Sequence, residues 1–235
     1  LFNYVLKKVY FLCLKRSNGV ITCSNSLYYD LKDNLTISAN VIYNSVDTDY
    51  FKIKESGSKL FGIPNEKSIF IFTGPNNERK NISFLIDAFN NIIRNDFFLI
   101  IIGKNCELLK SDIKNENILI LDEVNCVLKY LQLADVYISA SSAEGFPNSV
   151  LEALSCGLFP ILSNIGPHKE MIFSNSYKYG ALFEIDNSSN LTKILENFDL
   201  EKITSKNNIR NFCLQNFSIE QMSKKYKNIY INGNK

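Results

Sequence analysis

The stretch 136–163 reads VYISASSAEGFPNSVLEALSCGLFPILS and holds a complete strand–helix–strand pattern. Its two ends, 136–139 and 159–163, are short apolar runs of the kind found in buried strands. Between them, 149–156 spaces its apolar residues three and four apart, as a helix that covers a sheet does. Alternation of this kind predicts a parallel sheet.

The same alternation extends toward both ends of the chain. Further strands are expected at 20–23, 41–43, 68–73, 97–102 and 118–121, and further helices at 81–94 and 124–133. The pattern predicts an α/β fold with a doubly wound, Rossmann-like parallel sheet. Ligands of such sheets bind at the carboxyl ends of the strands, which directs attention to the loops after Thr73, Ile102, Leu121 and Ser139.

Composition limits the classes of function. The 235 residues are 46% hydrophobic, which suffices for a packed core, and 26 basic and 24 acidic residues leave a net charge of only +2. No dense basic face is expected, so nucleic acid is not predicted as a ligand. The six cysteines form no CxxC pair and His168 is the only histidine, so no metal site is predicted and the cysteines are interpreted as buried free thiols in a reducing cytoplasm.

The two ends of the chain are expected to be helical. Residues 1–16 pattern as an amphipathic helix, for which core packing is preferred over the alternative of peripheral contact with the inner face of the cell membrane. Residues 218–231 pattern as an amphipathic closing helix. The chain begins with Leu1 and not with Met, which predicts further sequence upstream, and the polar composition of 44–64 predicts a domain boundary near Asn44.

Two adjacent cations lie near the end of the loop 74–81, which reads GPNNERKN and leads into a predicted helix. Arg79 and Lys80 beside unpaired backbone N–H groups would make an anion site. The alternative is a solvated turn with surface charges near Glu78.

Two carboxylates stand around a predicted helix start at Pro147 and Asn148. Glu144 falls in the loop and Glu152 in the first helical turns, so both are expected at one crevice mouth. Ser149 and Glu152 also have capping-box spacing, which would explain Glu152 without a ligand but leaves Glu144 and Gly145-Phe146-Pro147 unused. Burying Phe146 beside an acid is costly unless something polar binds there, and a nucleotide sugar supplies suitable hydroxyls and phosphates.

Glu144-Gly145-Phe146 followed by Glu152 resembles the E-x7-E motif of retaining GT-B glycosyltransferases of family 4, also called glycosyltransferase group 1. The flanks ADVYI (134–138) and LEALSCG (151–157) are similar to those of that family. The run 41–47 resembles its interdomain crossover, and 74–81 its basic phosphate clamp. Pro75 stands where many members carry Arg, so Arg79 and Lys80 would take that role.

The resemblance implies a GT-B arrangement. Residues 1–43 would be the end of an N-terminal acceptor domain, 44–215 the Rossmann-like donor-binding domain, and 216–235 a closing helix that packs back toward the first. The enzyme would be a cytoplasmic hexosyltransferase of polysaccharide biosynthesis. It would transfer sugar with retention and without metal or other cofactor from a nucleoside-diphosphate sugar to a glycan or lipid-linked saccharide.

The resemblance also implies roles for single residues. Glu144, Lys80 and Arg79 would be catalytic. Glu152 would hold the ribose hydroxyls, Glu144 the sugar hydroxyls, and the loop at Val124 would lie near the base. The donor would be bound by Arg79, Lys80, Val124, Glu144, Gly145, Phe146, Pro147, Asn148, Ser149 and Glu152. His168 would cap a helix or border the cleft and would not act as general base.

Two other functions remain open at this point. The chain could be a nucleotide-sugar-binding module that is inactive without an N-terminal domain or a partner chain, or a sugar-nucleotide epimerase of similar fold. A dinucleotide-dependent oxidoreductase is disfavoured, because no GxGxxG follows any predicted strand.

Overall fold

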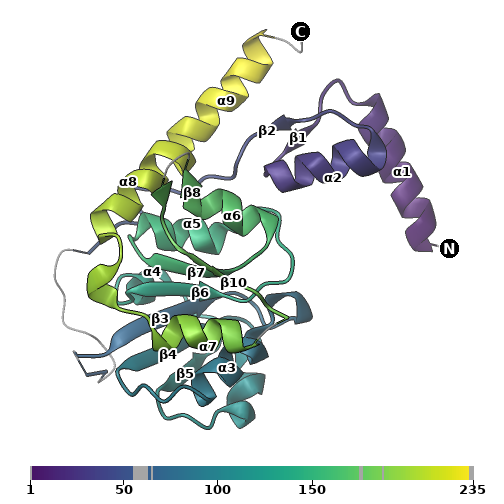
Figure 1. Cartoon of the computed structure of the whole chain (residues 1–235). Helices are drawn as coiled ribbons and strands as arrows, with labels where there is room; N and C mark the ends of the chain where they lie inside the picture. Colours follow the sequence, from purple (N-terminus) through teal and green to yellow (C-terminus); the bar gives the residue numbers. More distant parts are fainter. Residues whose placement is uncertain (1, 55–62, 65, 175–176, 187, 233–235) are drawn as a thin grey trace.

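A six-stranded parallel sheet forms the centre of the molecule (Figure 1). The computed structural model describes residues 2–54, 63–64, 66–174, 177–186 and 188–232, so residues 55–62 of the polar segment 44–64 lie outside the described residues. The strands run in the order β10-β7-β6-β3-β4-β5. They are β3 (Ser68–Thr73), β4 (Phe97–Ile102), β5 (Ile118–Leu121), β6 (Val136–Ser139), β7 (Phe159–Ser163) and β10 (Ala181–Phe183). The predicted α/β fold with a parallel sheet is confirmed.

Helices cover both faces of the sheet. Successive strand residues point to opposite faces, and since both sets are apolar, each face packs against a layer of helices. Phe70 and Phe72 face α3 (Ile82–Asn90) and α7 (Ser188–Glu196). Ile69 and Ile71 face the other layer, which is made of α4 (Leu128–Leu131), α5 (Asn148–Ser155), α6 (Gly166–Ile172) and α8 (Lys206–Phe217). All four strand side chains are at most 1% exposed, which explains the uninterrupted apolar run of β3.

Two predicted helices are shorter than expected. In the segment 81–94, helix α3 follows a 3-10 turn, η1 (Glu78–Lys80), and ends at Asn90. The segment 124–133 forms only the single turn α4, and Val124 and Val127 before it line a cavity at the sheet edge. The remaining short elements are η2 (Cys106–Asp112), η3 (Leu200–Lys202) and the hairpin of β8 (Phe173–Ser174) and β9 (Tyr177–Lys178).

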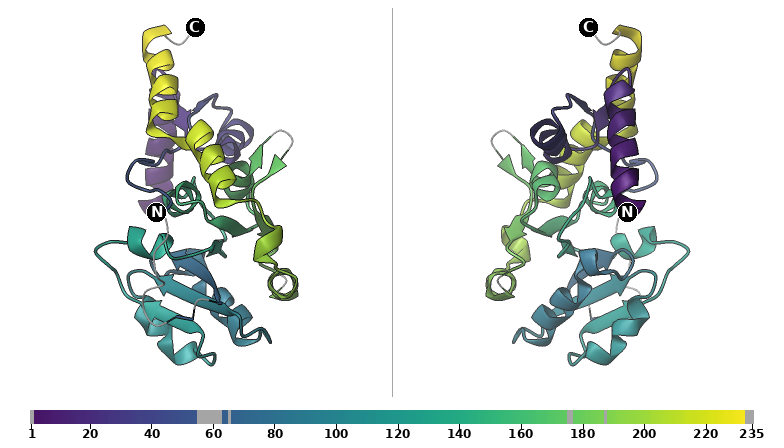
Figure 2. Two further views of the ribbon diagram at one scale, coloured as in Figure 1. Left: turned by 90° about the vertical axis from the view of Figure 1, so that its left-hand side faces the viewer. Right: turned by 90° about the vertical axis from the view of Figure 1, so that its right-hand side faces the viewer.

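The predicted strands at 20–23 and 41–43 do not join the main sheet. They form β1 (Ile21–Thr22) and β2 (Asn40–Val41), a parallel pair of their own, with α2 (Asn25–Leu35) between them. Figures 1 and 2 show this group together with α1 (Phe2–Arg16) beyond α6, at one end of the molecule. The division of the chain after residue 43 and after residue 215 stays a prediction.

The two terminal helices extend away from the sheet. The predicted closing helix is α9 (Ile219–Asn232), which follows α8 directly and begins beside the crossover, where Val46 pairs with Ser218. The prediction that the first helix packs into the core is wrong for the described residues, since Val9 and Leu12 are 50% and 51% exposed. Among the helices that the structure describes, none is long and apolar enough to cross a membrane.

The cysteines are all unpaired thiols. Cys106, Cys156 and Cys213 are buried as predicted, whereas Cys13 is exposed on α1 and Cys23 and Cys126 are half-buried. The expectation of uniformly buried thiols was therefore wrong for half of them.

Candidate functional site

The candidate site lies where the order in which the chain adds strands to the sheet reverses. From β3 the chain adds β4 and β5 on one side and then returns to add β6 on the other, so β3 and β6 are neighbours at a topological switch point. In open α/β sheets this point leaves a crevice outside the carboxyl ends of the strands. Thr73 ends β3 and Ser139 ends β6, and the loops that follow them carry the predicted residues.

The loop after β3 is shaped by a cap. Asn77 precedes η1, and its side-chain oxygen accepts a hydrogen bond from the Lys80 backbone N–H at 3.1 Å. The tight turn that follows buries the Lys80 side chain, which is only 10% exposed. A lysine held this deeply needs a partner of opposite charge.

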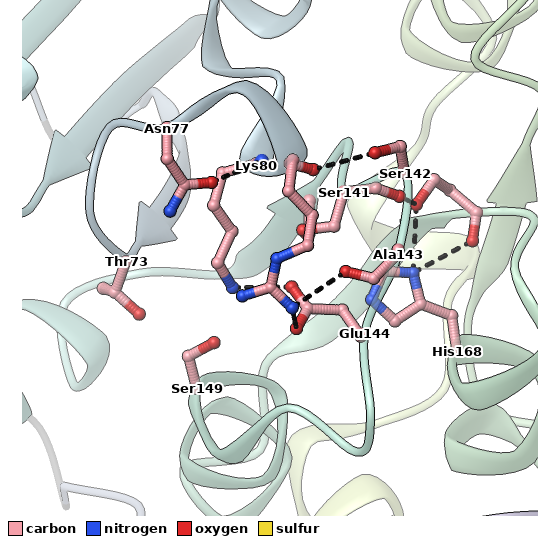
Figure 3. Close-up of polar contacts among 12 residues, drawn as sticks. Thr73, Asn77, Lys80, Ser141, Ser142, Ala143, Glu144, Ser149 and His168 are labelled. Carbon is pink, nitrogen blue, oxygen red and sulfur yellow. Dashed lines mark hydrogen bonds and ion pairs between the residues drawn. The ribbon is translucent and has the colours of Figure 1, made fainter. Parts of the chain in front are cut away.

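Glu144 supplies that partner. Lys80 Nζ donates to Glu144 Oε1 at 2.6 Å (Figure 3), and Arg79 Nη1 lies 3.1 Å from Glu144 Oε2. The Glu144 side chain is 6% exposed, whereas that of Arg79 is 49% exposed. The prediction placed these three side chains at one crevice, and the structure brings them together as an ion-pair cluster in which one carboxylate serves both cations.

Backbone contacts fix the two loops of the cluster to each other. The Ser142 N–H donates to the Arg79 carbonyl at 2.8 Å, and Arg79 Nη1 donates to the Ala143 carbonyl at 3.1 Å. These contacts connect the loops after β3 and β6. For Lys80 the arrangement replaces the alternative of a solvated turn, whereas the Arg79 side chain remains 49% exposed.

Phe146 is buried for a reason that differs from the predicted one. Its ring stacks on Tyr43 at 4.7 Å between centroids and meets Phe217 edge-on at 5.5 Å. The Asn44 side-chain amide also donates to the Phe146 carbonyl at 2.8 Å. Aromatic partners from both ends of the chain explain the burial of Phe146, so the argument that a bound polar ligand is needed there was wrong.

The helix that carries Glu152 begins as predicted, but its cap differs. Asn148 is the first residue of α5 and Pro147 occupies the cap position without a side-chain hydrogen bond. Ser149 Oγ lies 2.9 Å from the buried Tyr137 hydroxyl, which also lies 3.2 Å from the Thr73 carbonyl. Ser149 thus ties α5 to β6 and β3, and the capping box with Glu152 does not form.

Glu152 faces a cavity of about 460 Å³, a volume that suits a small ligand. Burial raises the pKa of Glu152 to about 7. The wall combines loops from three strands with α5: Thr73, Gly74, Pro75, Ile102, Gly103, Lys104, Glu123, Val124, Val127, Ser149 and Glu152. Three of the four strand-end loops singled out in the sequence meet here.

A close backbone approach shapes the floor of this cavity. A Cβ atom on Gly103 would overlap the Gly74 carbonyl oxygen, so the β3 and β4 loops come together only because residue 103 has no side chain. Pattern reasoning missed Gly103, Thr73, Lys104 and Tyr137. Two glycines that each follow a strand directly are the signal that could have found the close approach.

Six of the ten predicted residues divide between two adjoining places, and Gly145, Phe146, Pro147 and Asn148 belong to neither. Glu152, Ser149 and Val124 line the cavity, whereas Arg79, Lys80 and Glu144 form the ion-pair cluster beside it. The two places meet at Gly74, where a Cβ would lie 3.6 Å from Lys80 Cε. Figure 3 shows Thr73 and Ser149 on one side of the Lys80 side chain and Ser142 and Ala143 on the other.

His168 is a buried residue within α6 and caps no helix. Its Nδ1 donates to the Ser163 carbonyl at 3.0 Å and lies 3.1 Å from the Ser163 hydroxyl, in a tautomer assigned from these contacts. Burial lowers the pKa of His168 to about 4, so the ring is neutral at pH 7. Within the described part of the chain, no group of three His, Cys, Asp or Glu side chains is arranged to hold a metal ion.

The family model for glycosyl transferases group 1 matches residues 54–211, which is more than half of the chain. The chain belongs to this family. The match includes the ion-pair cluster and every residue of the cavity wall.

Curated relatives have similar sequences. The chain is 28% identical over 242 residues to the Escherichia coli UDP-Gal:alpha-D-GlcNAc-diphosphoundecaprenol alpha-1,3-galactosyltransferase, with 94% of this chain and 59% of that protein covered. It is 26% identical over 201 residues to a Campylobacter jejuni N-acetylgalactosamine-N,N'-diacetylbacillosaminyl-diphospho-undecaprenol 4-alpha-N-acetylgalactosaminyltransferase, covering 81% of this chain and 53% of that protein. The chain therefore spans less than two thirds of the length of these relatives.

Solved structures share the fold. A glycosyltransferase from Rickettsia africae superposes with a TM-score of 0.80 at 23% identity, covering 97% of this chain and 66% of its own. Anabaena HepE in complex with UDP and glucose superposes with a TM-score of 0.80 at 17% identity, covering 97% of this chain and 67% of its own. The fold is that of GT-B glycosyltransferases.

Proposed function

We propose that this chain supplies the donor-binding part of a glycosyltransferase, which transfers a sugar from a nucleoside-diphosphate sugar to a lipid-linked saccharide or other glycan. The observation that carries the proposal is the junction at Gly74. The ion-pair cluster, with the two cations Lys80 and Arg79, lies there directly beside a cavity of about 460 Å³. A nucleotide sugar needs both features, because its nucleoside requires an enclosed volume and its diphosphate requires positive charge.

The cavity suits the nucleoside. Val124 and Val127 provide an apolar wall for a base, and Glu152 provides a carboxylate for the ribose hydroxyls. The pKa of about 7 for Glu152 lets the carboxylate form accept hydrogen bonds at neutral pH once hydroxyl donors stabilise its charge.

The cluster suits the diphosphate and the sugar. Lys80 and Arg79 would neutralise charge that develops on the departing nucleoside diphosphate, as preorganised cations do. The first N–H groups of α5, at Asn148 and Ser149, would assist because no side chain caps this helix start. Glu144 would accept hydrogen bonds from the sugar hydroxyls, and the backbone from Gly145 to Pro147 would line the sugar.

We also propose, from the resemblance of Glu144 and Glu152 to the E-x7-E motif, that the enzyme belongs to family 4, retains the anomeric configuration and requires no metal ion. The names of the Escherichia coli and Campylobacter jejuni relatives both specify a diphospho-undecaprenol-linked saccharide, and the former specifies UDP-Gal. We therefore place a UDP-sugar first among donors and a lipid-linked saccharide first among acceptors. A lipid-linked acceptor would bring the protein to the inner face of the cell membrane as a peripheral enzyme.

A second candidate is a donor-binding module that is inactive by itself. The chain covers only 59% of the Escherichia coli relative, which favours a requirement for further sequence or a partner chain. The epimerase alternative loses support, because the matching family is one of transferases.

Binding of nucleoside diphosphates tests the proposal. Thermal unfolding would be followed with UDP, GDP, ADP and CDP, and UDP at about 100 times its dissociation constant should stabilise the protein by about 2.7 kcal/mol. Lys80→Ala should weaken UDP binding at least about tenfold, because a buried charge-assisted contact is lost. Lys110→Ala is the matched control, since Lys110 is exposed and forms an ion pair with Glu107 on the surface.

Equal affinity of the parent and Lys80→Ala for UDP would refute the role of Lys80. Transfer of labelled sugar to a diphospho-undecaprenol-linked saccharide then separates the two candidates. Product formed by this chain alone supports the enzyme, and UDP binding without product supports the inactive module.

A further inference from the structure

One carboxylate joins α6 to the amino end of α2. Glu170 Oε2 accepts hydrogen bonds from the Asn25 backbone N–H at 2.7 Å and from its side-chain amide at 3.1 Å. Glu170 Oε1 accepts from the Ser26 backbone N–H at 2.8 Å and from its hydroxyl at 2.7 Å. The first N–H groups of a helix have no partner within the helix, so Glu170 completes the cap that Ser24 begins by accepting from Leu27 at 3.2 Å.

Tyr43 connects this cap to the loop that carries Glu144. The Tyr43 hydroxyl accepts from the Asn25 side-chain amide at 2.6 Å. Burial, together with the nearby charge of Glu170, raises the pKa of Tyr43 to about 12. The Tyr43 ring stacks on Phe146 with an interplanar angle of 9°, and Phe146 follows Glu144 by two residues.

Two glycines let α2 approach the site without intervening side chains. A Cβ on Gly166 would overlap the Ser26 hydroxyl and lie 2.9 Å from Ser26 Cβ. A Cβ on Gly145, next to Glu144, would lie 3.3 Å from Cys23 Sγ. The start of α2 is therefore seated against both the Glu144 loop and the start of α6.

We propose that Glu170 is a positioning residue for Glu144: by capping α2 it holds that helix against Gly145 and Gly166, and through Tyr43 it fixes Phe146. The packing stands independently of the proposed function, and only the consequence for sugar binding rests on it. No residue of α2 or α6 lines the nucleotide cavity in the described chain. Glu170 should therefore affect contacts with the sugar and leave the affinity for the nucleotide alone unchanged.

Hydrogen–deuterium exchange tests the positioning directly, with no ligand present. Glu170→Gln replaces one acceptor oxygen by an amide that faces donors, so exchange should accelerate at least about tenfold at Asn25 and Ser26. If Glu170 positions the loop, the amides of Glu144, Gly145 and Phe146 should accelerate with them. Acceleration confined to α2 would overturn the proposal.

Two further variants serve as a control and as a second test of this result. Lys169→Gln is the matched control, because Lys169 is an exposed residue of the same helix, and it should leave both segments at the parent rate. Ser26→Ala removes one of the four donors to Glu170 and should produce a smaller change in the same two segments. It supplies the test if Glu170→Gln fails to fold.

Ligand binding supplies a readout that general destabilisation would not move. Dissociation constants would be measured for UDP and for UDP-glucose, UDP-galactose and UDP-N-acetylglucosamine. Glu170→Gln should bind UDP within about twofold of the parent, while the affinity gained from the sugar falls about tenfold. Equal loss of affinity for UDP and for every UDP-sugar would contradict the positioning role. If the parent protein binds no UDP, the proposed function is overturned, and the hydrogen–deuterium exchange result alone decides the role of Glu170.

Discussion

Glu152 should make the stability of this protein depend on pH. Burial raises the pKa of Glu152 from 4.5 to about 7, so the folded state holds a proton that the unfolded state has released between these pH values. An acid with a raised pKa favours folding at low pH, and its contribution is lost as the pH rises toward 7 and beyond. Replacing it by Glu152→Gln removes this dependence and leaves the volume nearly unchanged.

The size of the effect follows from the difference between the two pKa values. A change from 4.5 to about 7 corresponds to about 3 kcal/mol when the group is shielded from solvent. The cavity is open to water, so screening reduces the expected value to about 1–2 kcal/mol. The parent should lose this much stability relative to Glu152→Gln between pH 5 and pH 8.

Urea unfolding at pH 5, 6, 7 and 8 measures the difference in the free energy of unfolding between the two proteins. The subtraction matters because the lowered pKa of His168, about 4, acts in the opposite sense and destabilises both proteins as the pH falls below about 6.5. Glu123→Gln is the control, since Glu123 lines the same cavity from an exposed position. Parallel pH curves for the parent and Glu152→Gln would refute the reasoning.

Three further predictions follow from packing and reactivity. Gly103→Ala should lower the thermal midpoint and weaken UDP binding, because its methyl group overlaps the Gly74 carbonyl; unchanged values by thermal shift and calorimetry would count against the close approach. Phe146→Ala should lower the free energy of unfolding, measured with urea, by about 3–5 kcal/mol, because Phe146 is 3% exposed and packs between two aromatic rings. A loss below about 1 kcal/mol, as for a surface substitution, would contradict that core contact. Cys126 should react with iodoacetamide faster than Cys13, because the Lys129 backbone N–H lowers its thiol pKa; mass spectrometry of limited labelling checks the order, and equal rates would contradict it.

Much of the sheet could be predicted from the sequence. The strands β3 to β7 occupy the expected residues, because each is a short apolar run that can be recognised without knowledge of its neighbours. All but the edge strand β5 have buried residues on both faces. The strand β10 was not predicted, because it has only three residues and two of them are half-buried. The helix α2 was missed as well: none of its residues is buried, so no strong apolar stripe marks it.

The candidate site was predictable only where charge and position coincide. Glu144, Lys80 and Arg79 stand in strand-end loops, which the doubly wound pattern brings to one edge. Phe146 was misinterpreted because its partners Tyr43 and Phe217 are distant in sequence, and Tyr137 looks like any core residue of a strand. Tertiary contacts of this kind leave no local pattern.

The sharing of Glu144 between Lys80 and Arg79 has a consequence for anion selectivity. The carboxylate acts as a tethered competitor, present at a high effective concentration, for any phosphate that approaches the two cations. A free inorganic phosphate competes with the Glu144 carboxylate only at its own concentration in solution. The diphosphate of a nucleotide that is already bound in the cavity competes at a high effective concentration, as the carboxylate does. We therefore expect a site that stays closed to the abundant small anions of the cell and opens to a diphosphate only when a nucleoside comes with it.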